Sequence, residues 1–443
     1  MNDSTDLHHI VIVGGGAGGL ELAARLGRKL GKKKKAEITL IDATRTHLWK
    51  PLLHEVAAGT LNSYEDELSY LALAYKNNFT SRVGRMDTLD REKQEISLEP
   101  TLDENGEEYI PRRTFHYDSL IIAVGSQTND FGIKGIKEHC MFLDTRTEAD
   151  LFHQRLLRDV YAAHTETKPL RKGQLKVAIA GAGATGVELS AELHEAFGQL
   201  VEFGLDQIST ENDIKISIIE AADRILPALP PRLSEKTEKA LNKINIEVLS
   251  GHRISEATEE GFVTDKGGLV PAEIKIWAAG IKAPDFLKEI AGLETNRSNQ
   301  LIVKTTLETT RDENIFAMGD CAACPMEGTD NTVPPRAQAA NQQATMLAKT
   351  MVNRLKNKPL PTYKYVDYGS LINLSRYTTV GNMMGNLLGK SAGSVMIEGL
   401  LARFVYMSLY KMHQVVVLGI IRVTLTTIAN FLTQRTKTRM KLH

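Results

Sequence analysis

Two glycine-rich segments, about 170 residues apart, constrain the fold of this chain more than any other feature. Residues 14–19 read Gly-Gly-Gly-Ala-Gly-Gly and follow the aliphatic run 10–13, while residues 181–186 read Gly-Ala-Gly-Ala-Thr-Gly and follow the run 177–180. A strand, a glycine turn and a helix in this order are typical of a dinucleotide-binding unit. Two such units in one chain predict two dinucleotides held face to face, with electrons passing between them.

Each glycine of the motif has its own role. The first makes the turn, the second lets the backbone approach a pyrophosphate, and the third lets the helix pack close to the strand. A lone motif of this kind is weak evidence, but both copies also have an acid about 20 to 30 residues farther on. The predicted nucleotide contacts are Gly14, Gly16, Ala17, Gly18 and Gly19 in the first copy and Gly181, Gly183, Ala184, Thr185 and Gly186 in the second.

The acids that follow the motifs indicate how each ribose is bound. Asp42 and Glu220 end the second strand of their units and are placed to accept hydrogen bonds from ribose hydroxyls. An acid at this place repels a 2′-phosphate, so Glu220 favours NADH over NADPH. Arg224 follows closely and could weaken that preference by pairing with the phosphate.

Composition sets the outer limits. The chain has 443 residues, 42% hydrophobic and 24% charged, which is enough for two or three globular domains. Its formal net charge of zero gives no argument for nucleic acid, and three cysteines are too few for a disulfide framework, which favours a reducing compartment. A polar start argues against a signal peptide. Because no run of about 18 apolar residues lacks a charge, we expect no spanning helix.

Strand and turn patterns predict how the two units are arranged. The first is expected to be discontinuous, over residues 1–165 and 305–360, with a β-meander near 82–118. The second, over residues 166–304, is inserted in it, and residues 361–443 form a C-terminal region. The predicted fold class is therefore α/β, with two Rossmann-like dinucleotide-binding domains followed by an amphipathic membrane-binding region.

Further contacts are expected where buried strands end. Ala123 and Gly125 close one strand of the first unit, and Ala279 and Gly280 close one of the second. Gly319-Asp320 ends another buried strand, where the acid could hydrogen-bond the ribityl chain of a flavin or could cap the next helix. Combined with the first motif, the flavin interpretation is favoured.

Two other sets of residues allow competing interpretations. Cys321 and Cys324 could form a redox dithiol beside a flavin, but are more simply small buried packing residues. Metal is not expected, because zinc needs four ligands and Cys140 is the one remaining cysteine. Hydride transfer to a flavin needs no protein base. Packing or surface roles are therefore expected for the histidines, His47, His54 and His413.

The C-terminal tail is basic and apolar. From residue 399 to 443 it carries seven Lys or Arg and no acid, and residues 400–432 have a helical pattern. On a helical wheel the polar members fall within a sector of about 100°, and these are Arg403, Lys411, Gln414 and Arg422. The tail ends in Arg435, Lys437, Arg439 and Lys441. This pattern predicts binding to an anionic membrane surface, the alternatives being a helix packed on the protein body or in a homodimer interface.

Taken together, these segments resemble the type II NADH:quinone oxidoreductases, especially the bacterial respiratory NADH dehydrogenases. The similarity extends over nearly the whole chain and is specific outside the glycine motifs. The matching segments are residues 11–21, 47–55, 183–193, 224–227, 277–281, 319–320 and 335–340. Sister flavin reductases share the glycine motifs but not the Trp49-Lys50-Pro51-Leu52-Leu53 segment or this tail.

The resemblance implies non-covalent FAD on the first domain, NADH on the second, and a membrane quinone near the flavin. It places Lys50, Pro51 and Leu52 along the flavin, with Glu188 and Gln338 near the nicotinamide and quinone as candidate catalytic residues. Glu188 could equally be a buried helix residue satisfied by a backbone amide. Lys390 is a weak candidate for a lysine at the quinone headgroup.

The predicted function is therefore transfer of a hydride from NADH to FAD and of two electrons onward to ubiquinone or menaquinone, without proton pumping. The protein is expected at the cytoplasmic face of the bacterial inner membrane, as a peripheral, monotopic enzyme. Two rivals are a soluble flavin reductase acting on a disulfide or a small redox protein, and a membrane flavoprotein serving mainly as a binding or signalling module.

Overall fold

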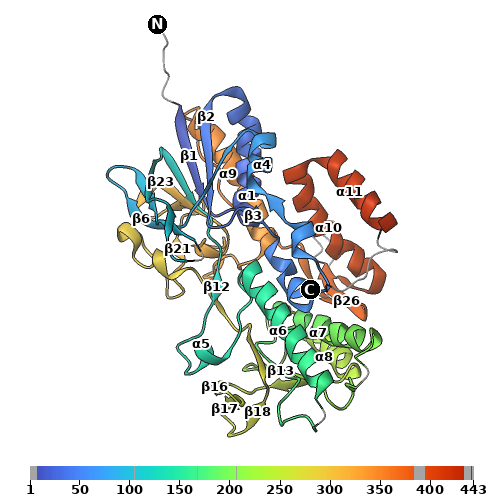
Figure 1. Cartoon of the computed structure of the whole chain (residues 1–443). Helices are drawn as coiled ribbons and strands as arrows, with labels where there is room; N and C mark the ends of the chain where they lie inside the picture. Colours follow the sequence, from blue (N-terminus) through green and yellow to red (C-terminus); the bar gives the residue numbers. More distant parts are fainter. Residues whose placement is uncertain are drawn as a thin grey trace.

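The computed structural model contains two largely parallel sheets, one above the other in Figure 1, with helices packed against them. The structure describes residues 7–103, 105–166, 168–205, 207–383, 395–433 and 441. Each glycine motif follows a central strand of one sheet, so the two motifs occupy equivalent places. The predicted fold class is confirmed.

The first sheet has six strands in the order β22-β23-β11-β1-β2-β5. They are β1 (His8–Val13), β2 (Ala36–Asp42), β5 (Thr80–Val83), β11 (Ser119–Ile122), β22 (Glu308–Thr309) and β23 (Asp312–Ala317). β22 is antiparallel to β23, and the other neighbours are parallel. Because β23 pairs with β11, the chain leaves this sheet and later returns to it. The helices α1 (Ala17–Lys29), α4 (Tyr70–Asn77) and α9 (Ala337–Arg354) accompany this sheet.

The second sheet has four parallel strands in the order β15-β14-β13-β19. They are β13 (Lys176–Ala180), β14 (Lys215–Glu220), β15 (Ile246–Ser250) and β19 (Ile274–Trp277), with helices α7 (Ala184–Glu202) and α8 (Pro231–Lys243). The strands and helix expected around the second motif are therefore confirmed. The exact domain bounds stay a prediction.

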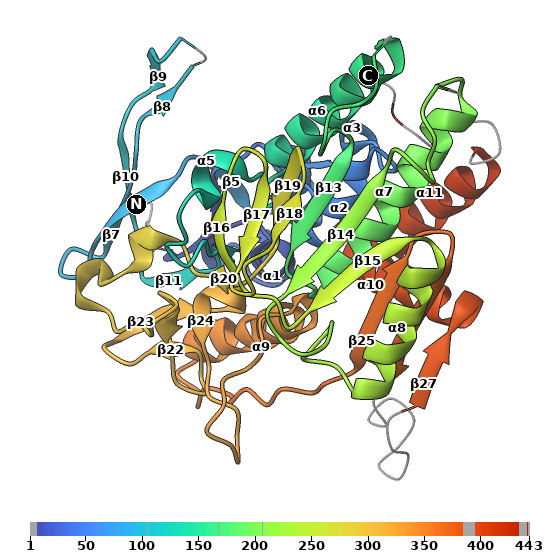
Figure 2. The same ribbon diagram turned by 90° about the horizontal axis from the view of Figure 1, so that it is seen from below.

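Smaller sheets surround this framework. The expected meander is the antiparallel sheet of β6 (Met86–Asp90), β7 (Glu95–Leu98) and β10 (Arg113–His116), and the hairpin β8 (Thr101–Leu102) and β9 (Glu108–Ile110) projects from the body in Figure 2. A second antiparallel sheet contains β16 (Ile254–Ala257), β17 (Gly261–Thr264) and β18 (Leu269–Pro271). Two-stranded pairs are β3 (Thr46–His47) with β4 (Leu68–Ser69), β12 (Gln127–Thr128) with β20 (Ile281–Lys282), and β21 (Leu301–Ile302) with β24 (Ala322–Ala323).

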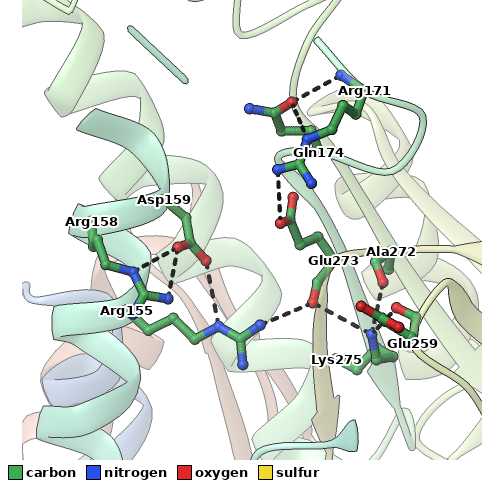
Figure 3. Close-up of polar contacts among 9 residues, drawn as sticks. All are labelled: Arg155, Arg158, Asp159, Arg171, Gln174, Glu259, Ala272, Glu273 and Lys275. Atoms are coloured by element: carbon green, nitrogen blue, oxygen red, sulfur yellow. Dashed lines mark hydrogen bonds and ion pairs between the residues drawn. The ribbon is translucent and has the colours of Figure 1, made fainter. Parts of the chain in front are cut away.

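Helix α6 (Arg146–Thr165) is fastened to the second sheet by polar contacts (Figure 3). Arg155 donates to the backbone carbonyl of Glu273 at 3.3 Å. The buried ammonium of Lys275 donates to the carbonyls of Glu259 and Ala272, at 2.8 and 3.0 Å. Burial lowers the pKa of Lys275. These carbonyls replace the water that the buried charge has lost.

The short helix α2 (Leu53–Ala58) packs between α6 and α7. Its apolar residues belong to the same hydrophobic core as the strands of the second sheet. In the chain, however, α2 comes directly after the strands β1 and β2 of the first sheet and the short β3. The remaining short helices are α3 (Ser63–Asp66) and α5 (Ile136–His139). Segment 50–58 therefore connects the surroundings of the two glycine motifs.

The C-terminal region begins with an antiparallel sheet and ends in two helices. Its elements are β25 (Gly369–Leu374), β26 (Thr378–Met383), β27 (Val395–Glu398), α10 (Gly399–Leu418) and α11 (Ile420–Thr433). The helical pattern expected over residues 400–432 is confirmed, and Gly419, with φ +84°, divides it into two helices. Gln414 was placed on a polar outer sector, but its side chain is buried.

One face of α10 packs against α1, α4 and β26, and both helices expose many apolar side chains. The exposed ones are Phe404, Met407, Leu409, Met412, Ile420, Ile421, Leu425, Ile428, Phe431 and Leu432. Lys441 pairs with Asp150 and lies over the ring of Tyr64, so it faces the protein body. Arg435, Lys437, Arg439 and Lys390 lie outside the described residues. Within the described part of the chain, no helix is long and apolar enough to cross a membrane.

Candidate functional site

The first glycine loop, between β1 and α1, permits very close backbone packing. Gly14 has φ +105°, and a Cβ there would lie 2.3 Å from the carbonyl oxygen of Ala123. A Cβ on Gly19 would lie 1.9 Å from the carbonyl oxygen of Gly14. A Cβ on Gly16, at the N-terminus of α1, would meet nothing within 4 Å. The loop is therefore tight on its inner side and open where a phosphate would meet the helix N-terminus.

Asp42 holds the first loop in place. Its Oδ2 accepts a hydrogen bond from the amide of Gly15 at 2.6 Å, and its Oδ1 accepts from the amide of Thr44 at 2.8 Å. The carboxylate is half-buried at the end of β2. Ala17 begins α1 behind it, and Gly18 is covered by Met318 and Ala340. The predicted nucleotide contacts of the first motif thus meet at the ends of β1 and β2.

The second loop repeats this arrangement. Gly181 has φ +96°, and a Cβ there would lie 2.8 Å from the Cα of Ala279. A Cβ on Gly186 would lie 2.0 Å from the carbonyl oxygen of Gly181. Glu220 accepts from the amide of Ala182 at 2.8 Å, as Asp42 does in the first loop. The three residues after Ala182 are exposed, namely Gly183, Ala184 and Thr185.

Arg224 does not reach toward a nucleotide. Its guanidinium donates to the carbonyls of Leu229 and Pro227 at 2.8 and 2.7 Å, and to the hydroxyl of Ser234 at 2.6 Å. These bonds connect Arg224 to the segment that follows it, residues 227–234, and so stabilise that loop. Pairing of Arg224 with a 2′-phosphate would require these bonds to break.

Residues expected to line a flavin meet around Ser126. Lys50 donates to the carbonyl of Ser126 at 2.8 Å and pairs with Asp144 at 3.1 Å. The hydroxyl of Ser126 donates to Asp320 at 2.8 Å. Burial raises the pKa of Asp320, and the hydrogen bond from Ser126 and the charge of Lys50 oppose that shift.

A cavity of about 270 Å³ opens beside this group. Its lining includes Lys282, Gln300, Asp320, Val333 and Pro335.

The other predicted flavin and nucleotide contacts differ in their surroundings. Gly125 has φ +70°, with nothing within 4 Å of a Cβ, and Gly319 has φ +71°. Pro51 is exposed and Leu52 is buried. Gly280, with φ +69°, lies under the ring of Phe131.

Glu188 and Gln338 both bind backbone of the C-terminal sheet. Glu188 accepts from the amide of Asn373 at 3.0 Å, and Gln338 donates to the carbonyl of Gly369 at 3.1 Å. The two anchoring residues lie at opposite ends of β25, roughly 13 Å apart at the usual rise per residue. Burial raises the pKa of Glu188 to about 8. Glu188 is thus a buried helix residue with one backbone partner, and it is also protonated at neutral pH.

A cluster of buried and half-buried acids around Glu188 was not predicted from the sequence. Burial, and then the charge of Glu192, raise the pKa of Glu55 to about 8. The pKa of Glu192 is also raised by burial, although Thr60 donates to this carboxylate at 2.9 Å. His54 lies 4.0 Å from Glu188 and 3.9 Å from Glu55. The signal was present, because Glu188, Glu192 and Glu195 recur along one face of an otherwise apolar helix.

Helix α10 covers this acidic cluster. Tyr406 is nearly buried, and its hydroxyl has no hydrogen-bond partner among the described residues. The Nε2 of His54 likewise lacks one. Burial and the neighbouring carboxylates, Glu188 first, raise the pKa of Tyr406. Unpaired buried polar atoms beside neutral acids mark a place where a polar ligand or water would be stabilised.

His47 and His413 form a buried chain that joins the first loop to α10. Nδ1 of His47 lies 2.9 Å from the carbonyl oxygen of Gly15, and Nε2 of His47 lies 3.0 Å from Nε2 of His413. Nδ1 of His413 lies 2.8 Å from the carboxylate of Glu21. Trp49 stacks on Tyr410 and His413. These histidines therefore have a packing role, and the surface alternative was wrong for all three, since His54 is buried too.

The cysteines occupy apolar surroundings. Cys140, Cys321 and Cys324 are buried and free. Burial raises the pKa of Cys321 to about 11 and that of Cys324 to about 12. The thiol of Cys321 donates to the carbonyl of Met318 at 3.2 Å. A thiolate nucleophile is strongly disfavoured in these positions, which supports the packing interpretation.

Comparisons with known proteins agree with this geometry. The model of the pyridine nucleotide-disulphide oxidoreductase family matches residues 8–344. A type II NADH:quinone oxidoreductase of Haemophilus influenzae is 40% identical over 449 residues, covering 99% of this chain and 100% of that protein. One from Staphylococcus aureus (strain NCTC 8325 / PS 47) is 28% identical over 393 residues, covering 87% and 92%.

Two solved structures share the fold. NDH2 from Plasmodium falciparum in complex with NADH superposes with a TM-score of 0.81 at 20% identity, covering 98% of this chain and 100% of that chain. The sulfide:quinone oxidoreductase of Aquifex aeolicus has a TM-score of 0.72 at 18% identity, covering 97% and 96%. By the family model and the Haemophilus influenzae relative, this chain belongs to the pyridine nucleotide-disulphide oxidoreductase family and, within it, to the type II NADH:quinone oxidoreductases.

Proposed function

We propose that this chain oxidises NADH and reduces a membrane quinone, with a non-covalently bound FAD between them. The observation that carries the proposal is the pair of matching glycine loops, each with an open helix N-terminus and a clamping acid. Bound FAD would supply the redox chemistry, accepting a hydride from NADH and releasing two electrons to the quinone. The protein supplies binding and orientation.

The first loop fits an FAD pyrophosphate. The backbone at Gly16 and Gly125 is open, and the half-buried Asp320 lies beside a cavity, where its carboxylate can accept hydrogen bonds from a ribityl chain. Asp42 is placed for the ribose. The residues that would hold FAD are Gly14, Gly16, Ala17, Gly18, Gly19, Asp42, Lys50, Pro51, Leu52, Ala123, Gly125, Gly319 and Asp320.

The second loop is suited to a nucleotide that enters and leaves. Its outer residues are exposed, and Glu220 at the end of β14 disfavours a 2′-phosphate. The residues that would hold NADH are Gly181, Gly183, Ala184, Thr185, Gly186, Glu220, Ala279 and Gly280.

The acid cluster beneath α10 supports quinone reduction. Reducing a quinone to a quinol takes up two protons, and Glu188 and Glu55 hold protons at neutral pH because burial raises both pKa values to about 8. We assign Glu188 the role of proton donor beside the quinone. Gln338 orients the adjacent strand through its bonds to residues 367–369.

The exposed apolar faces of α10 and α11 support membrane attachment. They suit a peripheral enzyme on the cytoplasmic face of a bacterial inner membrane, where NADH and quinone are both accessible. We expect the reaction to proceed without proton pumping. The native quinone would be ubiquinone or menaquinone.

The activity is tested with purified, FAD-loaded protein and NADH. Oxidation of NADH is followed with a soluble ubiquinone analogue, with a disulfide substrate and with no acceptor. Rapid turnover with the quinone alone supports the proposal. Rapid turnover with the disulfide would favour the flavin-reductase rival, and slow turnover with every acceptor would favour the binding-module rival.

The role of Glu188 is tested by Glu188→Gln, with Glu202→Gln on the exposed end of the same helix as the control. We expect Glu188→Gln to lower turnover with the quinone by about tenfold to a hundredfold, while the NADH-dependent reduction of bound FAD keeps its rate. Equal quinone kinetics in both variants would remove Glu188 from the mechanism.

A further inference from the structure

A basic cavity of about 330 Å³ lies where α1, α4 and the end of α10 meet. Its polar wall contains Arg25, Arg28, Lys76 and Asn77, and its apolar wall contains Val415, Val416, Leu418 and Gly419. None of these residues belongs to the nucleotide loops or to the acid cluster. The volume is within the range of small-molecule sites.

Hydrogen bonds fix the cationic side chains around this cavity. Arg28 donates to the side-chain carbonyl of Asn77 at 2.5 Å, and the ammonium of Lys76 donates to the carbonyl of Leu418. Asn77 donates to the carbonyl of Val417 at 3.2 Å. Lys76 and Asn77 thereby cap the last turn of α10. The cap accounts for the position of these groups but leaves the positive charge largely unneutralised.

The cations around this cavity act on one another. The pKa of Lys76 is lowered, first by burial and then by the charges of Arg422 and Arg28. The pKa of Arg28 is lowered by burial and then by Arg25. The Nε of Arg25 is buried and has no hydrogen-bond partner among the described residues. Four cations from three helices thus lie close enough to repel one another.

One acid acts on this group in the described part of the chain, and it is already in use. Glu21 raises the pKa of Arg28. Its Oε1 faces His413 at 2.8 Å, and its Oε2 accepts from Asn341 at 2.6 Å and from Arg25 at 3.5 Å. A single shared carboxylate cannot balance four cations. An anion with several oxygens would be strongly favoured in the cavity.

The surroundings identify the kind of anion. Helix α11 starts one residue beyond the cavity, and all its residues except Val423 are exposed. Its first two residues are the apolar Ile420 and Ile421. On α4 the neighbouring Tyr75 is 91% exposed, and Leu71 is 71% exposed. Free phosphate would satisfy the cations but leave these apolar faces in water. A phospholipid satisfies both, because its phosphate and acyl chains are joined.

We propose that the cavity between α1, α4 and α10 binds the phosphate of an anionic phospholipid, with the acyl chains lying along α11. The site would fix the depth and the rotation of the protein at the membrane surface, a more specific task than general attraction to negative lipid. The proposal rests on the membrane attachment in the proposed function.

The test uses the FAD-loaded full chain and dihexanoyl phosphatidylglycerol below its micelle concentration, with binding followed by calorimetry. The variants are Arg28→Gln/Lys76→Gln and the charge-preserving Arg28→Lys. The control is Lys266→Gln/Lys288→Gln, which removes two exposed charges outside the cavity lining. We expect saturable binding of one lipid by the unmodified chain, weakened by about tenfold or more in the double cavity variant. Arg28→Lys and the control should bind within about twofold of the unmodified chain.

Other results would overturn the proposal. Inorganic phosphate that binds equally well and displaces the lipid would make this a soluble-phosphate site. Equal binding of dihexanoyl phosphatidylcholine, or equal weakening in the control, would show that the cavity does not select the anion. A tight dimer that binds no lipid would mean that a second copy covers the helices. Thermal melting of each variant separates a lost site from a lost fold.

The test also distinguishes this inference from the proposed function. Turnover of NADH with a soluble quinone does not need the lipid, so it is measured on the same samples. Normal turnover without lipid binding removes the lipid site alone. Lipid binding without turnover on any quinone removes the proposed function and leaves the site standing.

Discussion

The two glycine loops have nearly the same backbone but very different surroundings. The first glycine of each loop has a positive φ, +105° at Gly14 and +96° at Gly181. A Cβ on the third glycine would lie 1.9 Å (Gly19) or 2.0 Å (Gly186) from the carbonyl oxygen of the first. In the first loop Gly18 is covered, and the carbonyl of Gly15 accepts bonds from Tyr70 and His47. In the second, residues 183–185 are exposed. The two loops share one backbone, and we propose that the covered loop suits a resident cofactor and the exposed loop suits an exchanging substrate.

The two copies also differ in the bonding of the glutamate that lies two residues after the third glycine of each motif. Glu21 and Glu188 occupy the same place in the repeat, and both are buried. Glu21 bonds with His413, Asn341 and Arg25, whereas Glu188 accepts from the backbone amide of Asn373, and no cation of the described residues acts on its pKa. Burial therefore raises the pKa of Glu188 to about 8. The carboxylate of Glu21 therefore links neighbouring side chains in the first copy, whereas burial favours the protonated form of Glu188 in the second.

The largest effect is expected from a bulky residue at the third glycine. Gly19→Val would force side-chain atoms into the carbonyl of Gly14 and should yield protein without flavin absorbance. Gly186→Val makes the same clash in the second loop. It should keep bound flavin but raise the KM for NADH by about a hundredfold.

The control for both changes is Gly198→Val, where a Cβ would meet nothing within 4 Å. It should retain flavin and NADH affinity. Loss of flavin from Gly186→Val, with flavin kept in Gly19→Val, would reverse the assignment of the two loops.

The next effect concerns the pH dependence of stability. Burial raises the pKa of Glu188 from 4.5 to about 8, so between these values the folded chain binds a proton that the unfolded chain releases. The contribution of Glu188 to the free energy of unfolding should therefore be fully present below about pH 4.5 and be lost as the pH rises through 8. At about 1.4 kcal/mol per pKa unit, the loss amounts to a few kcal/mol. Glu188→Gln cannot ionise, so denaturant titrations at several pH values should show a smaller fall in stability than in the unmodified chain, the remainder coming from Glu55 and Glu192.

Glu21→Gln tests the other half of the comparison. It leaves His413 and Arg25 without their carboxylate, so it should destabilise the fold at neutral pH, where Glu188→Gln should not. Two variants with the same stability profile would mean that the two acids are electrostatically alike.

Much of this arrangement could be predicted because it depends on local pattern. Glycine spacing, aliphatic runs and the acids at residues 42 and 220 gave both nucleotide units, and the fold has them. Long-range contacts were not predictable from such patterns. The bond between His47 and His413 joins residues 366 apart, and Glu55 meets Glu192 only because α2 packs on α7. The helical pattern over 400–432 was predicted, but its division into two helices at Gly419 was not, because an apolar pattern does not reveal such a break.

A smaller effect is expected at the histidine chain. His413→Leu removes the partner of both His47 and Glu21, leaving buried polar atoms unpaired, so it should lower the free energy of unfolding by about 2–4 kcal/mol. It should speed FAD dissociation, because His47 holds the first loop, and leave the Kd for NADH unchanged. Met412→Leu, at a neighbouring exposed position, is the control. A change in NADH affinity with normal FAD retention would contradict the link between α10 and the first loop.

The smallest effect is expected from the cysteines, which lie beside the first loop's sheet but take no part in the proposed chemistry. Burial raises the pKa of Cys321 to about 11 and of Cys324 to about 12, so neither thiol ionises at neutral pH. Cys321→Ala/Cys324→Ala should therefore leave quinone-dependent NADH oxidation within about twofold. It should lower the unfolding free energy by about 1–2 kcal/mol through lost packing. Cys140→Ala, in the core near the second sheet, is the matched control. Loss of activity in the double variant alone, with flavin retained, would make the dithiol a redox centre, and electrons would then leave the first nucleotide site through sulfur rather than directly to the quinone.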